Sequence, residues 1–157
     1  MISNSFKIFL GSKVKNTNIS FDEIKLTYGD NTIFEKLSFN ITTKGISVIM
    51  GPNGSGKTLC LKLIKKLIKP ESGKISFESL EKINIGYVSQ KNKFLRRSVY
   101  ENLEYVLKIN KFNKNQIKKL IEEIIKITNF KKFINLSARS LSAGQQQLLS
   151  IMRGLVI

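Results

Sequence analysis

The sequence predicts a mixed α/β fold, and three observations support this. Short stretches of alternating or continuous apolar residues in the first half are typical of strands. A glycine-rich turn follows one of these stretches, and the pattern then changes to the 3.6-residue period of a helix. The second half has a helical pattern almost throughout. A chain of 157 residues is long enough for one domain with its own hydrophobic core.

The first half supplies the strands of the predicted sheet. Alternation of Leu37, Phe39 and Ile41 predicts one strand, and the apolar run at 45–50 is typical of a buried strand. The helix after the turn has an apolar face that includes Leu63 and Ile64, and we expect Pro70 to end it. Strands are expected at 21–28, 37–41, 45–50, 74–77 and 83–88.

Pairs with capping-box spacing predict the helices of the second half. Ser98 with Glu101 predicts a helix over 99–108, and Asn113 with Gln116 gives a weaker start signal for the next helix. A final capped segment begins at Ser142.

Composition excludes several classes of site. The absence of histidine excludes His-based catalysis or metal binding by these residues, and a single cysteine, Cys60, excludes an internal disulfide. The net charge of +16 permits either nucleic-acid or anionic-membrane binding, or simply the solvated faces of lysine-rich helices. No nucleic-acid motif accompanies the charge, so we expect no nucleic-acid partner. No apolar run is long enough to span a bilayer, and the start of the chain lacks a signal-peptide pattern.

Residues 51–58, Gly-Pro-Asn-Gly-Ser-Gly-Lys-Thr, match the phosphate-loop pattern G-x-x-x-x-G-K-[ST] at every fixed position. Glycines let successive N–H groups turn toward phosphate oxygens, and the positive end of the following helix adds to the anion site. Lys57 supplies a charge for the β- and γ-phosphates, and the Thr58 hydroxyl is suited to bind Mg²⁺. The motif therefore predicts binding of ATP with Mg²⁺. The predicted loop residues are Gly51, Asn53, Gly54, Ser55, Gly56, Lys57 and Thr58.

Further motifs resemble those of ABC ATPases, in the family's order. Residues 141–145, Leu-Ser-Ala-Gly-Gln, resemble the LSGGQ signature, and Arg153 falls at a usual arginine of the helix that follows. Residues 86–90, Gly-Tyr-Val-Ser-Gln, resemble the segment that ends on the family's Q-loop glutamine. Tyr28 matches the aromatic residue that stacks on adenine in this family. Together with the phosphate loop, these motifs cover nearly the whole chain.

The resemblance implies roles for the matched residues. Tyr28 would stack on the base, while Gln90 would contact Mg²⁺ or the water near the γ-phosphate and so count as catalytic. Ser142, Gly144 and Gln145 would face a phosphate bound by a second copy, because two copies of the family's domain enclose two nucleotides head to tail.

The sequence also departs from the family pattern. Ala143 replaces a glycine of the signature, and Leu148 replaces a common arginine. The family's catalytic Asp-Glu pair would be expected about seven residues beyond Ile157. Glu122 and Glu123 lie within a lysine-rich amphipathic pattern, and we interpret them as surface residues. The resemblance thus implies an ABC-type domain that is incomplete at its C-terminus and does not hydrolyse ATP by itself.

The expected organisation is an N-terminal extension at 1–20, a nucleotide-binding core at 21–92, a helical subdomain at 93–140 and the signature helix at 141–157. In the complete protein, the resemblance implies an ATP-hydrolysing subunit at the inner face of the cell membrane. Its partners would be a second copy, transmembrane permease subunits and a substrate-binding protein. Local similarity at 94–99 and 58–61 to tungstate-type importers suggests an oxyanion substrate.

Two alternatives remain open from the sequence alone. One is a soluble ABC ATPase of translation or DNA repair, and the other is a non-catalytic remnant that binds nucleotide.

Overall fold

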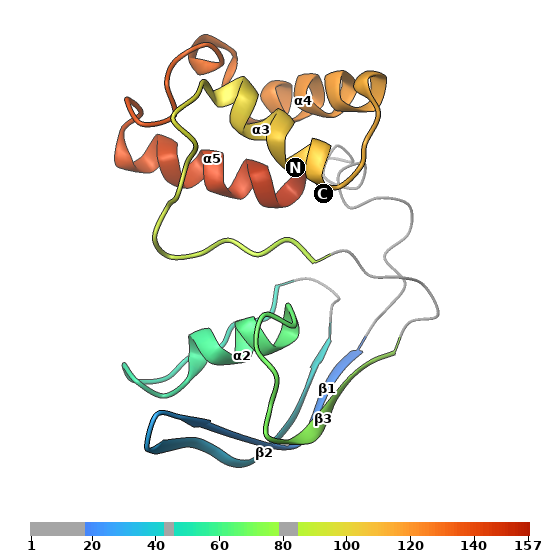
Figure 1. Cartoon of the computed structure of the whole chain (residues 1–157), viewed down its shortest axis with the longest axis vertical. Helices are drawn as coiled ribbons and strands as arrows, with labels where there is room; N and C mark the ends of the chain where they lie inside the picture. Colours follow the sequence, from blue (N-terminus) through green and yellow to red (C-terminus); the bar gives the residue numbers. More distant parts are fainter. Residues whose placement is uncertain (1–17, 43–45, 79–84) are drawn as a thin grey trace. The chain divides into compact units, whose positions relative to one another are not determined.

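The computed structural model describes residues 18–42, 46–78 and 85–157. Contacts divide the chain into a sheet unit within Lys13–Ile83 and a helical unit within Asn84–Ile157, which are described separately (Figure 1). Both strands and helices are present, as the α/β pattern predicts. The predicted extension at 1–20 lies mostly outside the described residues, and the predicted domain limits stay predictions. By its contacts, the segment 85–92 belongs with the helices.

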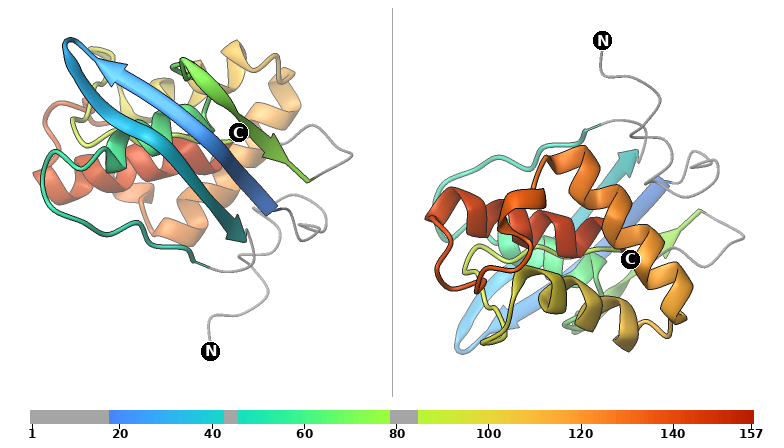
Figure 2. Two further views of the ribbon diagram at one scale, coloured as in Figure 1. Left: turned by 90° about the horizontal axis from the view of Figure 1, so that it is seen from below. Right: turned by 90° about the horizontal axis from the view of Figure 1, so that it is seen from above.

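The sheet unit contains an antiparallel three-stranded sheet in the order β2-β1-β3, with one helix on its face (Figure 2). The predicted strands at 21–28, 37–41 and 74–77 are confirmed, although all three begin earlier than expected. The elements are β1 (Asn18–Tyr28), β2 (Asn31–Thr42), β3 (Ser72–Phe77) and the helix α2 (Lys57–Ile64).

A bulge in β1 keeps the apolar side chains of this strand on the buried face. The register shifts between Phe21 and Ile24, where Glu23 takes a φ of 47°. The extra residue changes the alternation, so that Phe21 and Ile24 are both buried despite their odd spacing. On the neighbouring strand, Gly73 fits because a Cβ there would overlap the carbonyl of Glu23.

Two of the predicted strands are wrong. Residues 46–50 form no strand, and no strand among the described residues pairs with them. Their side chains Ile46, Val48 and Met50 are therefore 94%, 73% and 85% exposed. Of the strand predicted at 83–88, the described part, 85–88, is also irregular, because it packs against a helix instead of a strand.

The expectation that α2 would continue to Pro70 is also wrong, since α2 ends at Ile64. Lys66 takes a φ of 59°, its N–H donates to Leu63, and the Leu67 N–H donates to the carbonyl of Lys62. These two bonds form a Schellman turn, in which a lysine occupies the position where glycine is usual.

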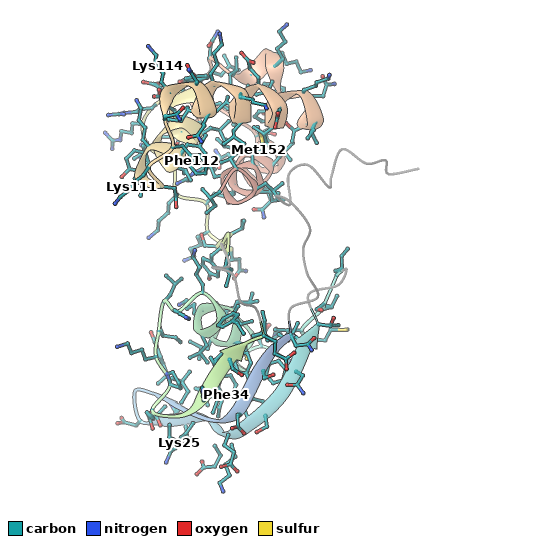
Figure 3. All side chains as sticks on the ribbon, turned by 90° about the vertical axis from the view of Figure 1, so that its right-hand side faces the viewer. Lys25, Phe34, Lys111, Phe112, Lys114 and Met152 are labelled. Atoms are coloured by element: carbon teal, nitrogen blue, oxygen red, sulfur yellow. The ribbon has the colours of Figure 1, made fainter. Side chains whose placement is uncertain are left out.

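The helical unit contains α3 (Val99–Ile109), α4 (Lys114–Thr128), the 3₁₀ turn η1 (Lys131–Phe133) and α5 (Ala143–Leu155). The three predicted capping boxes are confirmed, each with both of its hydrogen bonds. One continuous core joins the helices, and Met152 of α5 lies within it (Figure 3). Its twelve buried residues are Val99, Leu103, Leu107, Ile117, Ile121, Ile124, Phe130, Ala138, Leu141, Leu149, Met152 and Val156.

Asn102 is a polar residue with no exposed surface in the helical unit. Its Oδ1 accepts from the N–H of Leu95 at 3.0 Å, and its Nδ2 donates to the carbonyl of Ser98 at 2.9 Å. Nδ2 also lies 3.3 Å from the carbonyls of Leu95 and Arg97. Asn102 thus ties the chain ahead of α3 to the helix, where no water would satisfy these groups.

Candidate nucleotide site

The predicted phosphate loop enters directly into α2, which begins at Lys57. Gly54 and Gly56 have φ values of 85° and 88°, in the left-handed region that favours glycine. Gly56 also needs to lack a side chain, because a Cβ there would overlap the ring of Phe34 in β2. The loop is therefore seated against the sheet at Phe34, and its backbone shape depends on glycine.

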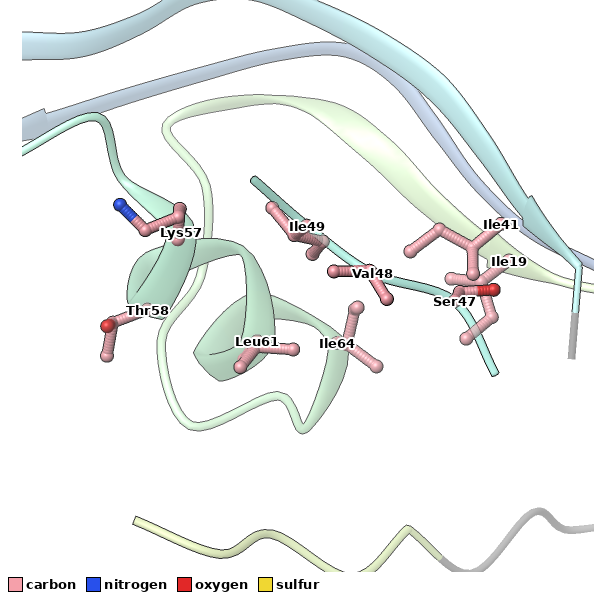
Figure 4. A pocket seen from close by; sticks show the side chains of 9 residues that line it. All are labelled: Ile19, Ile41, Ser47, Val48, Ile49, Lys57, Thr58, Leu61 and Ile64. Carbon is pink, nitrogen blue, oxygen red and sulfur yellow. The ribbon is translucent and has the colours of Figure 1, made fainter. Parts of the chain in front are cut away.

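Lys57 and Thr58 occupy the first turn of α2 (Figure 4). Lys57 Nζ donates to the carbonyls of Gly51 at 2.8 Å and Pro52 at 2.6 Å, so the ammonium is held over the loop by the loop's own backbone. Thr58 is exposed, as a metal-binding hydroxyl needs to be. This arrangement places one positive charge and one hydroxyl at the positive end of a helix, which suits a magnesium–phosphate ligand.

A cavity of about 420 Å³ lies beside the loop, between α2, the segment 46–50 and the ends of β1 and β2 (Figure 4). Its lining is mostly aliphatic, with Lys57 and Thr58 at one margin. An apolar lining does not suit phosphate, and Val48 and Leu61 in it are exposed, so we interpret this cavity as an open apolar groove of the sheet unit. The other lining residues are Ile19, Ile41, Ser47, Val48, Ile49, Leu61 and Ile64.

Tyr28 is the last residue of β1, and its side chain is 68% exposed. Two residues earlier, Leu26 pairs with Phe34, the same residue that contacts Gly56 of the loop. A strand advances about 3.3 Å per residue, so Tyr28 is about 7 Å along β1 from that pair. The structure thus brings Tyr28 and the loop into one region of the sheet unit, with the aromatic ring free. Its stacking on adenine stays a prediction.

Cys60 is a residue of α2 in the sheet unit, and its side chain is buried. Burial raises the pKa of its thiol above the ordinary value. The protonated form is therefore favoured, and Cys60 serves as a small buried residue.

The signature residues lie at the start of α5. Ser142 is the N-cap: its Oγ accepts from the Gln145 N–H at 3.4 Å, and Gln145 Oε1 accepts from the Ser142 N–H at 2.9 Å. Ser142, Ala143 and Gly144 are exposed, and a Cβ built on Gly144 would meet nothing within 4 Å. The helix end is therefore open to an approaching group. A contact with a second copy's phosphate stays a prediction.

Gln90 lies in the helical unit and is exposed. The hydroxyl of Ser89 donates to the carbonyl of Lys91 at 2.8 Å and closes a turn with Gln90 at its tip. The predicted magnesium contact pairs Gln90 with Thr58 of the other unit, and it stays a prediction.

Sequence reasoning overlooked two side chains close to this turn, Asn92 and Ser150. They form a hydrogen bond of 2.7 Å across 58 positions of the chain. No local pattern in a sequence can signal such a contact.

None of the described helices combines the length and the apolar character that crossing a lipid bilayer requires.

Curated relatives align with between about half and nine tenths of this chain. The molybdate/tungstate import ATP-binding protein WtpC of Methanocaldococcus jannaschii is 33% identical over 92% of this chain, which covers 48% of that protein. The tungstate uptake system ATP-binding protein TupC of Peptoclostridium acidaminophilum is 31% identical over 88% of this chain and 67% of that protein. The zinc import ATP-binding protein ZnuC of Rickettsia prowazekii is 38% identical over 46% of this chain and 30% of that protein. The chain thus spans between about a third and two thirds of these relatives.

Solved structures of ABC transporter proteins have the same fold as about nine tenths of this chain. A bacterial ABC transporter cassette solved as a dimer matches 88% of this chain and 69% of its own, with a TM-score of 0.75 and 28% identity. The cbiO1 protein of Clostridium perfringens, part of an ABC transporter complex, matches 90% of this chain and 62% of its own, with a TM-score of 0.76. At 24% identity, the latter supports the fold alone. The family model for the ABC transporter matches residues 34–157, so the chain belongs to the ABC transporter family, as its motifs predicted.

Proposed function

We propose that the chain is part of an ATP-hydrolysing subunit of an ABC importer. The observation that carries this proposal is the phosphate loop, where Lys57 Nζ lies over the carbonyls of Gly51 and Pro52 at the start of α2. The residues present fit ATP and Mg²⁺: the glycine backbone accommodates phosphate oxygens, Lys57 offsets their charge, and Thr58 offers an exposed hydroxyl to the metal. Bound Mg²⁺ would supply charge neutralisation between the phosphates.

Hydrolysis in this proposal needs a second copy of the chain. The open start of α5, with Ser142 as N-cap and a bare Gly144, suits a phosphate carried by that copy. A carboxylate must also orient the attacking water. Glu122 is exposed and Glu123 half-buried on α4 in the helical unit, and we propose that neither is the base. A polypeptide of residues 1–157 would then bind nucleotide without turning it over.

The proposed cargo is an oxyanion of the molybdate and tungstate class. Its support is that the relatives named for molybdate or tungstate are 33% and 31% identical over about nine tenths of this chain. The proposed partners are permease subunits, a second copy and a substrate-binding protein, at the inner face of the membrane. All three relatives above are named for import or uptake, which favours a transporter over the soluble alternative.

The test is ATP turnover by the full-length protein assembled with its permease in lipid vesicles. We expect turnover to rise when tungstate is supplied with the substrate-binding protein, and not when sulfate or zinc replaces it. Lys57→Ala should abolish turnover, while Glu122→Gln and Glu123→Gln should leave it unchanged. Turnover that responds to zinc alone would refute the oxyanion proposal, and an assembled complex without any turnover would favour the non-catalytic alternative.

A further inference from the structure

The segment 86–94, which carries Gln90, packs closely along the C-terminal half of α5. At the start of the segment, the backbone of Gly86 lies directly on that of Gly154. The approach is so close that a Cβ on Gly86 would overlap the Gly154 carbonyl. A Cβ on Gly154 would in turn come within 3.1 Å of Val88 Cγ2. Two glycines thus allow the segment and the helix to touch through their backbones.

The other end of the segment is fixed to α5 by polar contacts. Ser150 Oγ donates to Asn92 Oδ1 at 2.7 Å, and Arg153 Nη1 donates to the carbonyl of Lys93 at 2.8 Å. The guanidinium also lies 5.7 Å from the ring centroid of Phe94, within the range of a cation–π contact. Ser150 and Arg153 are three residues apart and so project from the same face of the helix.

Gln90 therefore lies in a short turn, and the residues on both sides of this turn contact α5. The bond from Ser89 to Lys91 shapes the turn, and Gln90 is exposed at its tip. The Arg153 Nε is buried without a hydrogen-bond partner among the described residues. A buried donor without a partner is costly, so the position of this guanidinium comes at the expense of stability.

We propose that Ser150 and Arg153 are positioning residues for Gln90, which makes α5 a rigid link between the Gln90 turn and the signature cap at Ser142. The inference rests on the proposed contact of Gln90 with Mg²⁺ or the attacking water. A helix of thirteen residues is about 20 Å long, so the two sites lie at separated points on one stiff element. Releasing Asn92 or Lys93 from α5 would let the turn move and misplace the Gln90 amide.

The test measures ATP binding to the full-length protein as Mg²⁺ is varied, with ATP binding in EDTA as the reference. Gln90→Ala and Arg153→Gln should each raise the Mg²⁺ concentration for half-maximal binding by roughly two- to tenfold, the effect of one hydrogen bond. The double variant should show no further rise, since both changes remove the same contact. Ser150→Ala should give a smaller shift in the same direction. Binding in EDTA should be unchanged throughout.

The matched control is Arg139→Gln, which removes an exposed guanidinium from the same unit and should change nothing. If Gln90→Ala shifts the Mg²⁺ dependence but Arg153→Gln and Ser150→Ala behave like the control, the link through α5 is refuted while nucleotide binding stands. Additive shifts in the double variant, or equal losses in Mg²⁺ and EDTA, would show a purely structural role and also refute it. If Gln90→Ala has no effect, the role of Gln90 fails, and the inference fails with it.

Discussion

The two units of the molecule differ in how completely each encloses its apolar residues. In the helical unit, twelve buried residues form one core, and each of the helices α3, α4 and α5 begins with a complete capping box. In the sheet unit, the apolar residues of 46–50 are left exposed beside a cavity of about 420 Å³. The proposed phosphate loop follows directly on that exposed segment.

The shape of the phosphate loop is therefore independent of strand pairing by the segment 46–50 that precedes it. The loop takes its shape from glycine φ values and from the contact of Gly56 with Phe34, both within the sheet unit. The segment leading into the loop has no partner strand among the described residues. We therefore expect substitutions of buried residues to destabilise the helical unit strongly. Substitutions at 46–50 should mainly affect the association of the chain with copies of itself.

The largest expected effect comes from opening the helical core. Leu149→Ala removes a side chain with no exposed surface from α5, and should lower the free energy of unfolding by about 2–5 kcal/mol. The control Ile151→Ala, on the same helix but 39% exposed, should cost much less. Urea unfolding followed by the helical circular dichroism signal gives both values. Equal costs would contradict the closed core.

The next effect concerns the buried amide of Asn102. Asn102→Ala leaves the Leu95 N–H and nearby carbonyls without their partner, and should cost about 1–3 kcal/mol. Asn115→Ala, at an exposed site on α4, is the control and should be nearly neutral. The same urea titration applies, and a neutral Asn102→Ala would mean that water replaces the amide.

Substitution of helix N-caps should lower the free energy of unfolding by less than the changes above. Comparing two caps separates a role in helix stability from a role in ATP hydrolysis. Ser142→Ala and Asn113→Ala each remove one N-cap, and each should cost about 1 kcal/mol of stability. Only Ser142→Ala should also lower ATP hydrolysis by the full-length protein, since only that cap would face a nucleotide. If both variants hydrolyse ATP normally, Ser142 is a helix cap and nothing more.

The smallest effect on stability is expected at the exposed segment. Val48→Lys in a polypeptide of residues 1–157 should change the free energy of unfolding by less than about 0.5 kcal/mol, because Val48 is 73% exposed. It should nevertheless reduce association measured by light scattering, since an apolar edge without a partner strand promotes aggregation. Ile109→Lys, at a 60% exposed site of the helical unit, is the control and should not reduce it.

Local signals explain what the sequence predicted correctly. Each of the three capping boxes needs only two residues three apart, and all three form. The strand at 37–41 follows from simple alternation, and the family follows from motifs whose order is visible in the chain.

The structural features that the sequence did not predict correctly have physical causes that lie outside local sequence patterns. The run at 45–50 has the composition of a buried strand, but a strand also needs a neighbour to accept its hydrogen bonds. The end of α2 was missed because Lys66, not glycine, adopts the left-handed conformation there. The packing of segment 86–94 on α5 joins residues about 60 positions apart, so only the structure reveals it.

In the proposed function, Mg²⁺-ATP binds at the phosphate loop through Lys57. Isothermal titration of the full-length protein tests it directly, with Lys57→Ala compared with Lys69→Ala, an exposed lysine of the same unit. We predict that Lys57→Ala weakens binding by about 1.5–3 kcal/mol, the value of a hydrogen bond to a charged group, and that Lys69→Ala leaves it unchanged. An affinity for ATP that is the same in the Lys57→Ala variant as in the unaltered protein would contradict the account.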